Sequence, residues 1–306
     1  MTLQIILAIA EIFGLFMIGA IARKLGYITD SEITRWSCLV MDFLMPPFMF
    51  VSIVKGFNAD RLQELWVLPA VGIGMVLFFT LAGYFLRFGL RSDDPDMRRT
   101  FLHLCAVNNS TFLPTIILRN LWGEALLSNL FLLYLGGAVG VWSFGVGMLG
   151  GASFKQTLRN ILTPTLIAIF CAVAVAATGT REFLPGLLMN ILGRVGSIAV
   201  PLMLILTGAS LAHRGIVRFT WQNLYIAVVR IIILPLLTIP ILWLLHLPED
   251  IYAVAVIVAL MPSAISSVIM TRRFGGNSDY AATTALITTT CCMITAPLGV
   301  WLFFGR

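Results

Sequence analysis

Two stretches of sequence, NNSTFLP at residues 108–114 and LMPSAISS at residues 260–267, decide the fold. Each places a proline and several small polar residues near the middle of a long apolar run. Proline lacks a backbone N–H and clashes with the carbonyl one turn earlier, so a helix kinks or breaks there. Broken backbone in a membrane must be buried in protein or line a wet cavity. A packed proline kink explains one such segment equally well, but two in corresponding positions favour a functional site.

The sequence around these stretches is that of a membrane protein. Of the 306 residues, 59% are hydrophobic and 11% are charged, whereas a soluble domain carries about 25% charged residues. Ten apolar runs follow one another, each long enough to cross a hydrocarbon core of about 30 Å. They cover roughly residues 3–22, 34–54, 65–86, 99–118, 126–149, 160–178, 187–211, 221–245, 251–271 and 281–304. The first run lacks a basic leader segment, so we interpret it as a span rather than a signal peptide.

The distribution of Lys and Arg predicts the orientation. Loops after odd-numbered runs hold thirteen of the 20 cations, whereas the even loops and the C-terminus together hold five. Because cytoplasmic loops carry the excess of Lys and Arg, we expect the odd loops in the cytoplasm and both termini outside. The expected location is the plasma membrane, which for a bacterium is the inner membrane.

The two halves of the chain resemble each other. Pro47 and Pro201 are 154 residues apart, and Pro114 and Pro262 are 148 apart. Five spans per half make the second copy enter the membrane from the opposite side, which is the inverted repeat of many transporters. We therefore expect an all-α polytopic membrane protein with ten transmembrane helices, two inverted five-helix repeats and broken, crossing helices 4 and 9. The expected repeats are residues 1–152 and 153–306.

The broken spans supply the predicted substrate site. The first N–H groups of each half-helix and its positive dipole end bind anions, while free carbonyls and small polar side chains can hold a cation or the polar remainder of a substrate. The candidate substrate-binding residues are Asn108, Asn109, Ser110, Thr111, Phe112, Pro114, Met261, Pro262, Ser263, Ser266 and Ser267. We interpret the prolines of spans 2 and 7 as bends that shape a supporting domain.

Four ionisable residues lie inside the apolar runs: Glu11, Asp42, Arg194 and Arg230. A charge at the bilayer centre costs about 2.5–3.5 kcal/mol or more unless it has a partner or water. Asp42, one turn before Pro46, is the best candidate for a proton- or sodium-coupling group, with Glu11 as the alternative. Arg194 and Arg230 either neutralise a substrate carboxylate or pair with one of these acids. A structural ion pair or an interfacial position explains each residue equally well when it is taken alone.

Other chemistries lack support in the sequence. The acidic residues of the 93–96 segment resemble one diphosphate-binding motif of membrane prenyltransferases, but no second motif follows, and a solvated turn is the favoured interpretation. The histidines and cysteines show no metal-ligand spacing, and no nucleophile elbow or P-loop is present. We therefore expect no enzyme activity, no metal and no cofactor. The scattered cations argue against nucleic acid as a partner.

Over nearly its whole length the chain resembles the auxin efflux carrier family, which includes bacterial malonate and malate permeases. The resemblance is most specific at residues 261–264, 273–276, 281–282, 288–289 and Pro297, and in the first half at residues 109–114. It implies a scaffold domain from spans 1, 2, 6 and 7 and a transport domain from spans 3–5 and 8–10. It also implies that Asn109, with Asn108 beside it, contacts the substrate carboxylate. The chain has Thr111 where the family often has glycine.

We therefore predict a secondary transporter of a small organic anion, a mono- or dicarboxylate such as malonate, malate or an auxin-like acid, working by alternating access. The alternatives are a sodium-coupled symporter of a larger amphipathic anion and, with less support, a membrane sensor or an integral-membrane transferase. The expected partners are the anion and the lipid bilayer. The sequence leaves open proton or sodium coupling, import or export, and whether the protein forms a homodimer.

Overall fold

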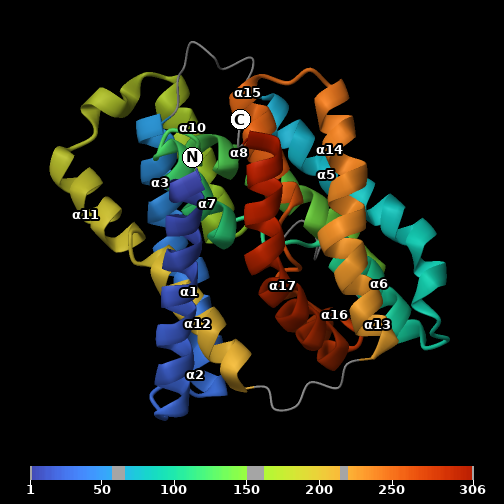
Figure 1. Ribbon diagram of the computed structural model, residues 1–306. Helices are drawn as coiled ribbons and strands as arrows, with labels where there is room; N and C mark the ends of the chain where they lie inside the picture. The colour runs from blue at the N-terminus through green and yellow to red at the C-terminus, as the bar shows by residue number, and fades with distance from the viewer. Residues whose placement is uncertain (1, 57–65, 150–161, 214–219, 305–306) are drawn as a thin grey trace.

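The computed structural model describes residues 2–56, 66–149, 162–213 and 220–304, and these residues fold almost entirely into helices (Figure 1). The first half contains α1 (Thr2–Lys24), α2 (Asp30–Leu39), α3 (Met45–Gly56), α5 (Val67–Leu86), α6 (Pro95–Ala106), α7 (Phe112–Trp122) and α8 (Leu127–Gly140). The second half contains α10 (Pro164–Ala177), α11 (Gly186–Gly196), α12 (Ala199–His213), α13 (Trp221–Val228), α14 (Leu234–Leu244), α15 (Glu249–Ala259), α16 (Ser266–Phe274) and α17 (Ser278–Phe304). The predicted repeat boundary at residue 152 lies outside the described residues.

Short π-helical and 3-10 segments join several of these helices. The π-helical segments are η1 (Val40–Leu44), η4 (Val141–Gly145) and η7 (Val229–Ile233), and the 3-10 segments are η3 (Arg87–Leu90), η5 (Gly147–Leu149) and η6 (Thr180–Phe183). The regular α-helix is interrupted near both sets of prolines, because η1 ends two residues before Pro46 and α11 ends five residues before Pro201.

Seven helical stretches in the described residues are long and apolar enough to cross a membrane, and they confirm an integral membrane protein. They are Leu3–Lys24, Asp30–Gly56, Val67–Leu90, Leu127–Leu149, Gly186–Ala212, Trp221–Leu244 and Ser278–Phe304. A shorter apolar helix, Pro164–Ala177, corresponds to the sixth apolar run. The fourth and ninth runs each form two helices with a gap between them, α6–α7 and α15–α16. The predicted breaks in these two runs are therefore confirmed.

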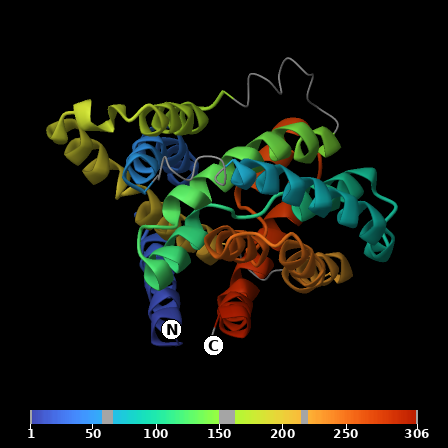
Figure 2. The same cartoon turned by 90° about the horizontal axis from the view of Figure 1, so that it is seen from above.

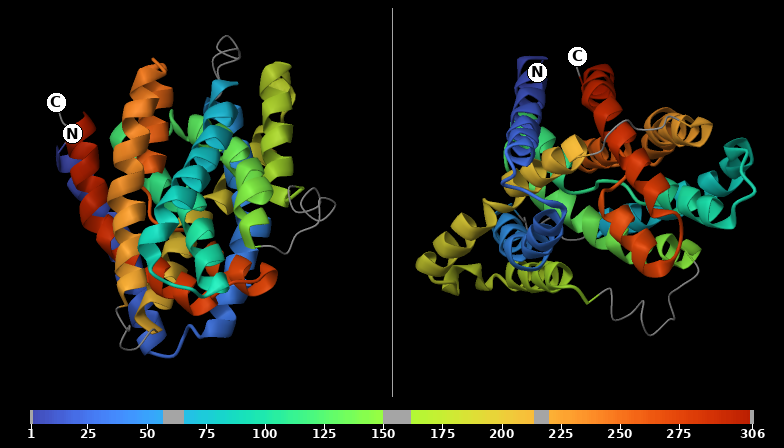
Figure 3. Two further views of the ribbon diagram at one scale, coloured as in Figure 1. Left: turned by 90° about the vertical axis from the view of Figure 1, so that its right-hand side faces the viewer. Right: turned by 90° about the horizontal axis from the view of Figure 1, so that it is seen from below.

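The helices pack in two groups, seen from above in Figure 2. In one group α1 packs against α12, and α3 packs against α10 and α11. In the other group α5 packs against α6 and α8, α14 against α15, and α17 against α13 and α16. The two groups meet where α1 contacts α7 and α17 and where α3 contacts α8. Figure 3 shows the same arrangement from the side and from below.

The α1–α12 contact depends on glycine. A β-carbon on Gly19 would collide with the backbone of Ile205, and one on Gly208 would collide with the backbone of Phe16. Small residues at these points let the two backbones approach closely, which is how membrane helices commonly pack. This contact fixes one group of helices as a unit beside the broken helices.

Each break has a local cause in the sequence. In the first, α6 ends at Ala106 and the chain continues as Val107 to Thr111 before α7 begins. Asn and Ser side chains compete for backbone hydrogen bonds and so disfavour helix interiors. In the second, Met261 precedes Pro262, and a residue before proline is pushed out of the helical conformation. Helix α15 accordingly ends at Ala259.

The positions of the prolines correct one expectation. Pro262 lies inside its break, whereas Pro114 is the third residue of α7 and lies after its break. The last helical residues before the breaks, Ala106 and Ala259, are 153 apart, so the offset of 148 between the prolines does not align the two breaks. Proline is tolerated in a first helical turn because the N–H it lacks has no intrahelical acceptor there.

Candidate functional site

The two breaks meet and pair through their backbones. The N–H of Asn109 donates to the Pro262 carbonyl over 2.8 Å, and the N–H of Ala264 donates to the Val107 carbonyl over 3.2 Å. These bonds flank an isolated antiparallel bridge between Asn108 and Ser263. Backbone groups that leave a helix inside a membrane need such partners. The predicted crossing of the two broken helices is therefore a directly hydrogen-bonded pair of extended segments, which we call the crossover (residues 107–111 and 260–265).

Side chains reinforce the crossover. The Asn108 amide Nδ2 donates to the Val258 carbonyl over 2.7 Å, and the Ser263 hydroxyl lies 3.4 Å from the Leu104 carbonyl. Each of these bonds reaches from one break to the last turn of the opposite half-helix. Carbonyls at a helix C-terminus have no intrahelical donor, so both bonds supply donors to such groups, and the Val258 carbonyl also accepts the N–H of Met261 over 3.2 Å.

Arg230 binds both sides of the crossover from the π-helical segment η7. Its Nε donates to the Met261 carbonyl over 3.0 Å, and a terminal nitrogen, Nη1, donates to the Cys105 carbonyl over 2.9 Å. The guanidinium also lies 4.6 Å from the centre of the Phe79 ring. The side chain is fully buried. The interpretation that Arg230 pairs with Asp42 or Glu11 is therefore wrong, because carbonyl oxygens are its partners.

The N-terminal ends of α7 and α16 have little side-chain capping. The residues that precede them, Thr111 and Ile265, make no side-chain capping bond to the helix. The Asn109 side chain accepts a hydrogen bond from the N–H of Phe112 over 3.2 Å. In α7, Pro114 has no N–H to offer. In α16 the N–H groups of Ser267 and Val268 donate to the backbone carbonyls of Ala264 and Ile265, so the positive ends of both half-helices begin at the crossover with little side-chain capping.

A cavity of about 710 Å³ opens beside the crossover. Candidate residues that line it are Asn108, Asn109, Ser110, Thr111, Phe112, Ser266 and Asp42. The remaining candidates, Pro114, Met261, Pro262, Ser263 and Ser267, lie buried behind this wall, and the Ser267 hydroxyl has no partner among the described residues. The structure brings the two predicted stretches together, but only part of each faces the cavity.

Several cavity residues were not among the candidates. The additional polar or charged lining residues include Asp30, Thr34, Tyr134, Thr163, Thr165, Thr207, Ser210, Arg272 and Asp279. Most of them lie in helices whose sequences resemble ordinary spans. The signal that could have found Thr207 and Ser210 is their position on span 7, within three turns after the bend at Pro201.

Asp42 lies on the wall opposite the broken helices. It belongs to η1, is exposed, and lines the cavity. The carbonyl of the preceding residue, Met41, accepts a hydrogen bond from the Thr165 hydroxyl over 2.9 Å, so a partner outside the helix supports the π-helical turn. Single π-helical turns occur frequently at functional sites. Among the described residues, Asp42 makes no ion pair, which agrees with a carboxylate open to the cavity.

Two other ionisable candidates lie elsewhere. Glu11 accepts a hydrogen bond from the Asn120 amide over 2.9 Å, which links α1 to α7. Arg194 is exposed near the C-terminal end of α11 and is not part of the cavity wall. The predicted pairing of Arg194 with an acid is not observed in the described residues. Neither residue is placed to contact a substrate at the crossover.

The acidic segment before α6 forms a capped turn. Asp94 is the N-cap of α6, and its carboxylate accepts the N–H of Asp96 over 3.0 Å. Asp93 pairs with Arg98 over 2.8 Å, with both side chains exposed. No group of three or more potential metal ligands occurs among the described residues. The turn has a structural explanation that needs no metal-bound diphosphate.

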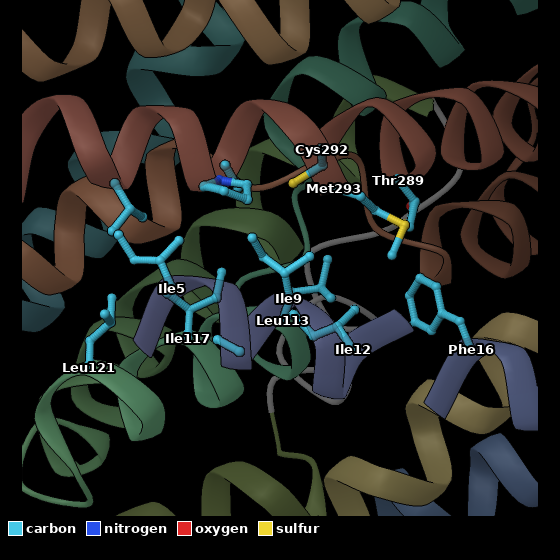
Figure 4. A pocket seen from close by; sticks show the side chains of 14 residues that line it. Ile5, Ile9, Ile12, Phe16, Leu113, Ile117, Leu121, Thr289, Cys292 and Met293 are labelled. Carbon is cyan, nitrogen blue, oxygen red and sulfur yellow. The ribbon is translucent and has the colours of Figure 1, made fainter. Parts of the chain in front are cut away.

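A second pocket lies between the two groups of helices (Figure 4). Its lining is almost entirely apolar, with Ile5, Ile9, Ile12 and Phe16 from α1, Leu113, Ile117 and Leu121 from α7, and Thr289, Cys292 and Met293 from α17. Its volume is about 30 Å³, against about 710 Å³ for the cavity beside the crossover. This pocket is a packing seam between helices, and its lining offers no charged side chain to hold a charged substrate.

An all-helical membrane protein whose two broken helices pair beside a cavity lined by both polar and apolar side chains has the architecture expected of a transport protein. The sequence pattern of the membrane transport protein family matches residues 4–156 and again residues 148–300. The chain belongs to this family of auxin-efflux-carrier-like transporters, and it is a transport protein rather than an enzyme.

Two curated relatives support the same class. An uncharacterized transporter of Methanocaldococcus jannaschii is 21% identical over 261 residues, which cover 84% of this chain and 85% of that protein. An uncharacterized transporter of Methanothermobacter thermautotrophicus is 22% identical over 267 residues, which cover 86% of each chain. Both are similar along nearly their whole length, so the likeness extends to both halves of the fold.

Proposed function

We propose that the protein is a secondary carrier of a small organic anion, a mono- or dicarboxylate such as malonate, malate or an auxin-like acid. The observation that carries this proposal is a difference between the helix ends at the crossover: side chains pair with the C-terminal carbonyls more fully than with the N-terminal N–H groups. Side chains from the opposite break and from η7 occupy the carbonyls at the ends of α6 and α15. At the N-terminal ends of α7 and α16, the preceding residues Thr111 and Ile265 make no side-chain cap, and the Asn109 side chain caps only the N–H of Phe112. N-terminal ends with so few side-chain caps beside a cavity favour a bound carboxylate.

The proposed transport cycle moves one group of helices against the other. In this proposal the chain has ten spans in two inverted repeats, and the scaffold consists of α1, α2–α3, α10 and α11–α12. The remaining helices form the transport domain that carries the crossover. The packing contacts support this division, because α1 packs mainly against α12, and α3 mainly against α10, with fewer contacts from α1 to the half-helix α7. The apolar seam of Figure 4 supports it too, since it offers few hydrogen bonds to break during sliding.

The cavity supports an inward-facing state. It extends from the crossover to Asp30, at the start of α2, and to Arg272 and Asp279, which flank the turn between α16 and α17. The turns between α1 and α2 and between α16 and α17 lie at this end of the molecule, and both chain ends lie toward the opposite end (Figure 1). With the bias of Lys and Arg, we infer that the cavity opens to the cytoplasm and that both termini face outward from a plasma membrane.

Asp42 is our proposed coupling group. The described cavity wall holds the carboxylates of Asp30, Asp42 and Asp279 but only one cationic side chain, Arg272. An anion approaching the crossover is repelled by an ionised Asp42, and a proton or a sodium ion on that carboxylate removes the repulsion. The same observation keeps a sodium-coupled symporter of a larger amphipathic anion as the second candidate.

Counterflow in liposomes tests the proposal. Purified protein is reconstituted in vesicles loaded with unlabelled malonate, malate or indole-3-acetate, and uptake of the labelled acid is followed with and without sodium and with a pH gradient. We expect labelled uptake above that of protein-free vesicles for at least one acid. Dependence on sodium or on the pH gradient identifies the coupling ion. Failure of every acid in the panel to accumulate would remove the carboxylate carrier from the account.

A further inference from the structure

Arg230 occupies an unusual position for a charge in a membrane protein. Among the described residues it is the only Lys, Arg, Asp or Glu that is buried, and its exposed fraction is 0%. A buried ionisable group in a membrane protein usually marks the pathway of the substrate or ion. Its Nη2 has no hydrogen-bond partner in the described structure, so the guanidinium is not fully satisfied by the groups around it.

The contacts of Arg230 are to the negative ends of both half-helices that enter the crossover. Cys105 is the penultimate residue of α6, and Met261 lies two residues after the end of α15. Each presents a backbone carbonyl to the guanidinium, at 2.9 Å for Cys105 and 3.0 Å for Met261. A single side chain therefore holds its charge between the C-terminal ends of two helices.

Four helix ends meet at the crossover, and their fields oppose one another. Each helix carries about half a positive charge at its N-terminus and about half a negative charge at its C-terminus. The N-terminal ends of α7 and α16 attract an anion, and the C-terminal ends of α6 and α15 repel it. With two ends of each sign, the backbone by itself gives little preference for either sign of ligand. The preferred sign of ligand therefore depends on which pair of helix ends the protein neutralises.

We propose that Arg230 is a positioning residue that sets the sign of the electrostatic potential at the crossover. Its positive charge cancels the negative ends of α6 and α15, so the positive ends of α7 and α16 dominate the potential there. This role deepens the proposed anion carrier and rests on it for its biological meaning. The positive local potential, however, exists without any substrate and can be measured without one. If Arg230 only held the two breaks together, its hydrogen bonds would be needed but its positive charge would not.

A reactive thiol at the crossover measures this potential directly. Ser110 lines the cavity, so Ser110→Cys places the thiol there. The exposed native thiols are removed as Cys38→Ser, Cys171→Ser and Cys291→Ser, and the buried Cys105 and Cys292 are kept. The thiol is treated with two methanethiosulfonates, one bearing a sulfonate and one a trimethylammonium group. Each forms a mixed disulfide and releases methanesulfinate.

The quantity compared is the rate constant for the anionic reagent divided by that for the cationic one. Both reagents react with the same thiolate, so changes in thiol ionisation cancel in this ratio. We expect Arg230→Gln to lower the ratio by about tenfold or more, as for a unit charge removed from on the order of 10 Å away at an effective dielectric constant of about 20. Arg230→Lys keeps the charge and is expected to keep most of the ratio. An unchanged ratio in Arg230→Gln, or an equal fall in Arg230→Lys, overturns the proposal.

A second measurement needs no substitution of Arg230 and so does not depend on how well its variants fold. Thr34 lines the same cavity on α2, one turn from the carboxylate of Asp30. With Arg230 in place, we expect the ratio for Ser110→Cys to exceed that for Thr34→Cys by about tenfold. Equal ratios for Ser110→Cys and Thr34→Cys contradict a positive electrostatic potential at the crossover. If this gradient is present and Arg230→Gln lowers the ratio but no carboxylate is taken up in counterflow, the proposed substrate is wrong while the role of Arg230 stands.

Discussion

Replacing Asn109 by aspartate tests the sign of the transported molecule with a change of almost no volume. Asn109 lines the cavity, and its Oδ1 already accepts a hydrogen bond from the N–H of Phe112 over 3.2 Å. The aspartate side chain retains an oxygen for that bond, so the start of α7 is preserved. The substitution exchanges the amide nitrogen, a donor, for a second acceptor oxygen and adds a negative charge.

The expected effect follows from two contributions. A carboxylate ligand loses a hydrogen bond to the amide, which contributes about 1.5–3 kcal/mol when one partner is charged. The new charge repels an anion about 5 Å away by roughly 3 kcal/mol at an effective dielectric constant of about 20. At about 1.4 kcal/mol for each factor of ten, the repulsion alone weakens the apparent affinity by more than about a hundredfold.

The assay is concentration-dependent counterflow of the acid that the wild-type protein transports. Asn109→Ala removes the donor without adding charge, so a loss of about tenfold to a hundredfold is expected for it. Asn190→Asp, at an exposed site on α11, is the matched control and should leave the apparent affinity within about threefold of wild type. An Asn109→Asp protein that transports as well as the Asn190→Asp control would refute an anion at this position. Improved transport would instead indicate a cationic substrate.

Three further predictions concern the parts around the site. Gly208→Ala should destabilise the protein by about 1–3 kcal/mol in thermal unfolding, because the new methyl group meets the Phe16 backbone, whereas Gly14→Ala on the same helix pair has open space and should be neutral. Asp42→Asn should leave counterflow exchange intact but abolish its dependence on the coupling ion; retained dependence would contradict the proposed coupling group. Asp94→Ala should lower stability by about 1 kcal/mol through loss of the α6 N-cap and leave transport intact, so loss of transport in a folded protein would revive a chemical role for the acidic turn.

Local chemistry alone located the breaks. Asn and Ser residues that compete with helical hydrogen bonds, and a proline that lacks an N–H, give the same effect in any surrounding protein. The sequence therefore predicted both interruptions and the residues in them. The alignment of Pro114 with Pro262 failed for a local reason too, because proline is equally acceptable inside a break and in the first turn after one.

Apolar length was the second property that the sequence determined. Hydrocarbon cannot satisfy polar backbone, so long apolar runs must form helices wherever they lie. The scarcity of charges identified an integral membrane protein, and the structure confirms long helices at most of the expected runs. Which of these helices touch, however, depends on close contacts such as that of Gly208 with Phe16, for which the hydropathy pattern carries no signal.

The partners of the ionisable residues were decided by tertiary structure. From sequence, Arg230 had carboxylates as its natural partners, but in the fold it lies between two carbonyls, those of Met261, 31 residues away along the chain, and Cys105, 125 residues away. A carbonyl has no signature in the sequence because every residue carries one. It becomes a partner for a guanidinium only when a helix ends beside it. The sequence determined where the helices break. Only the three-dimensional arrangement decided which ends of the broken helices are neutralised by a side chain and which can interact with a ligand.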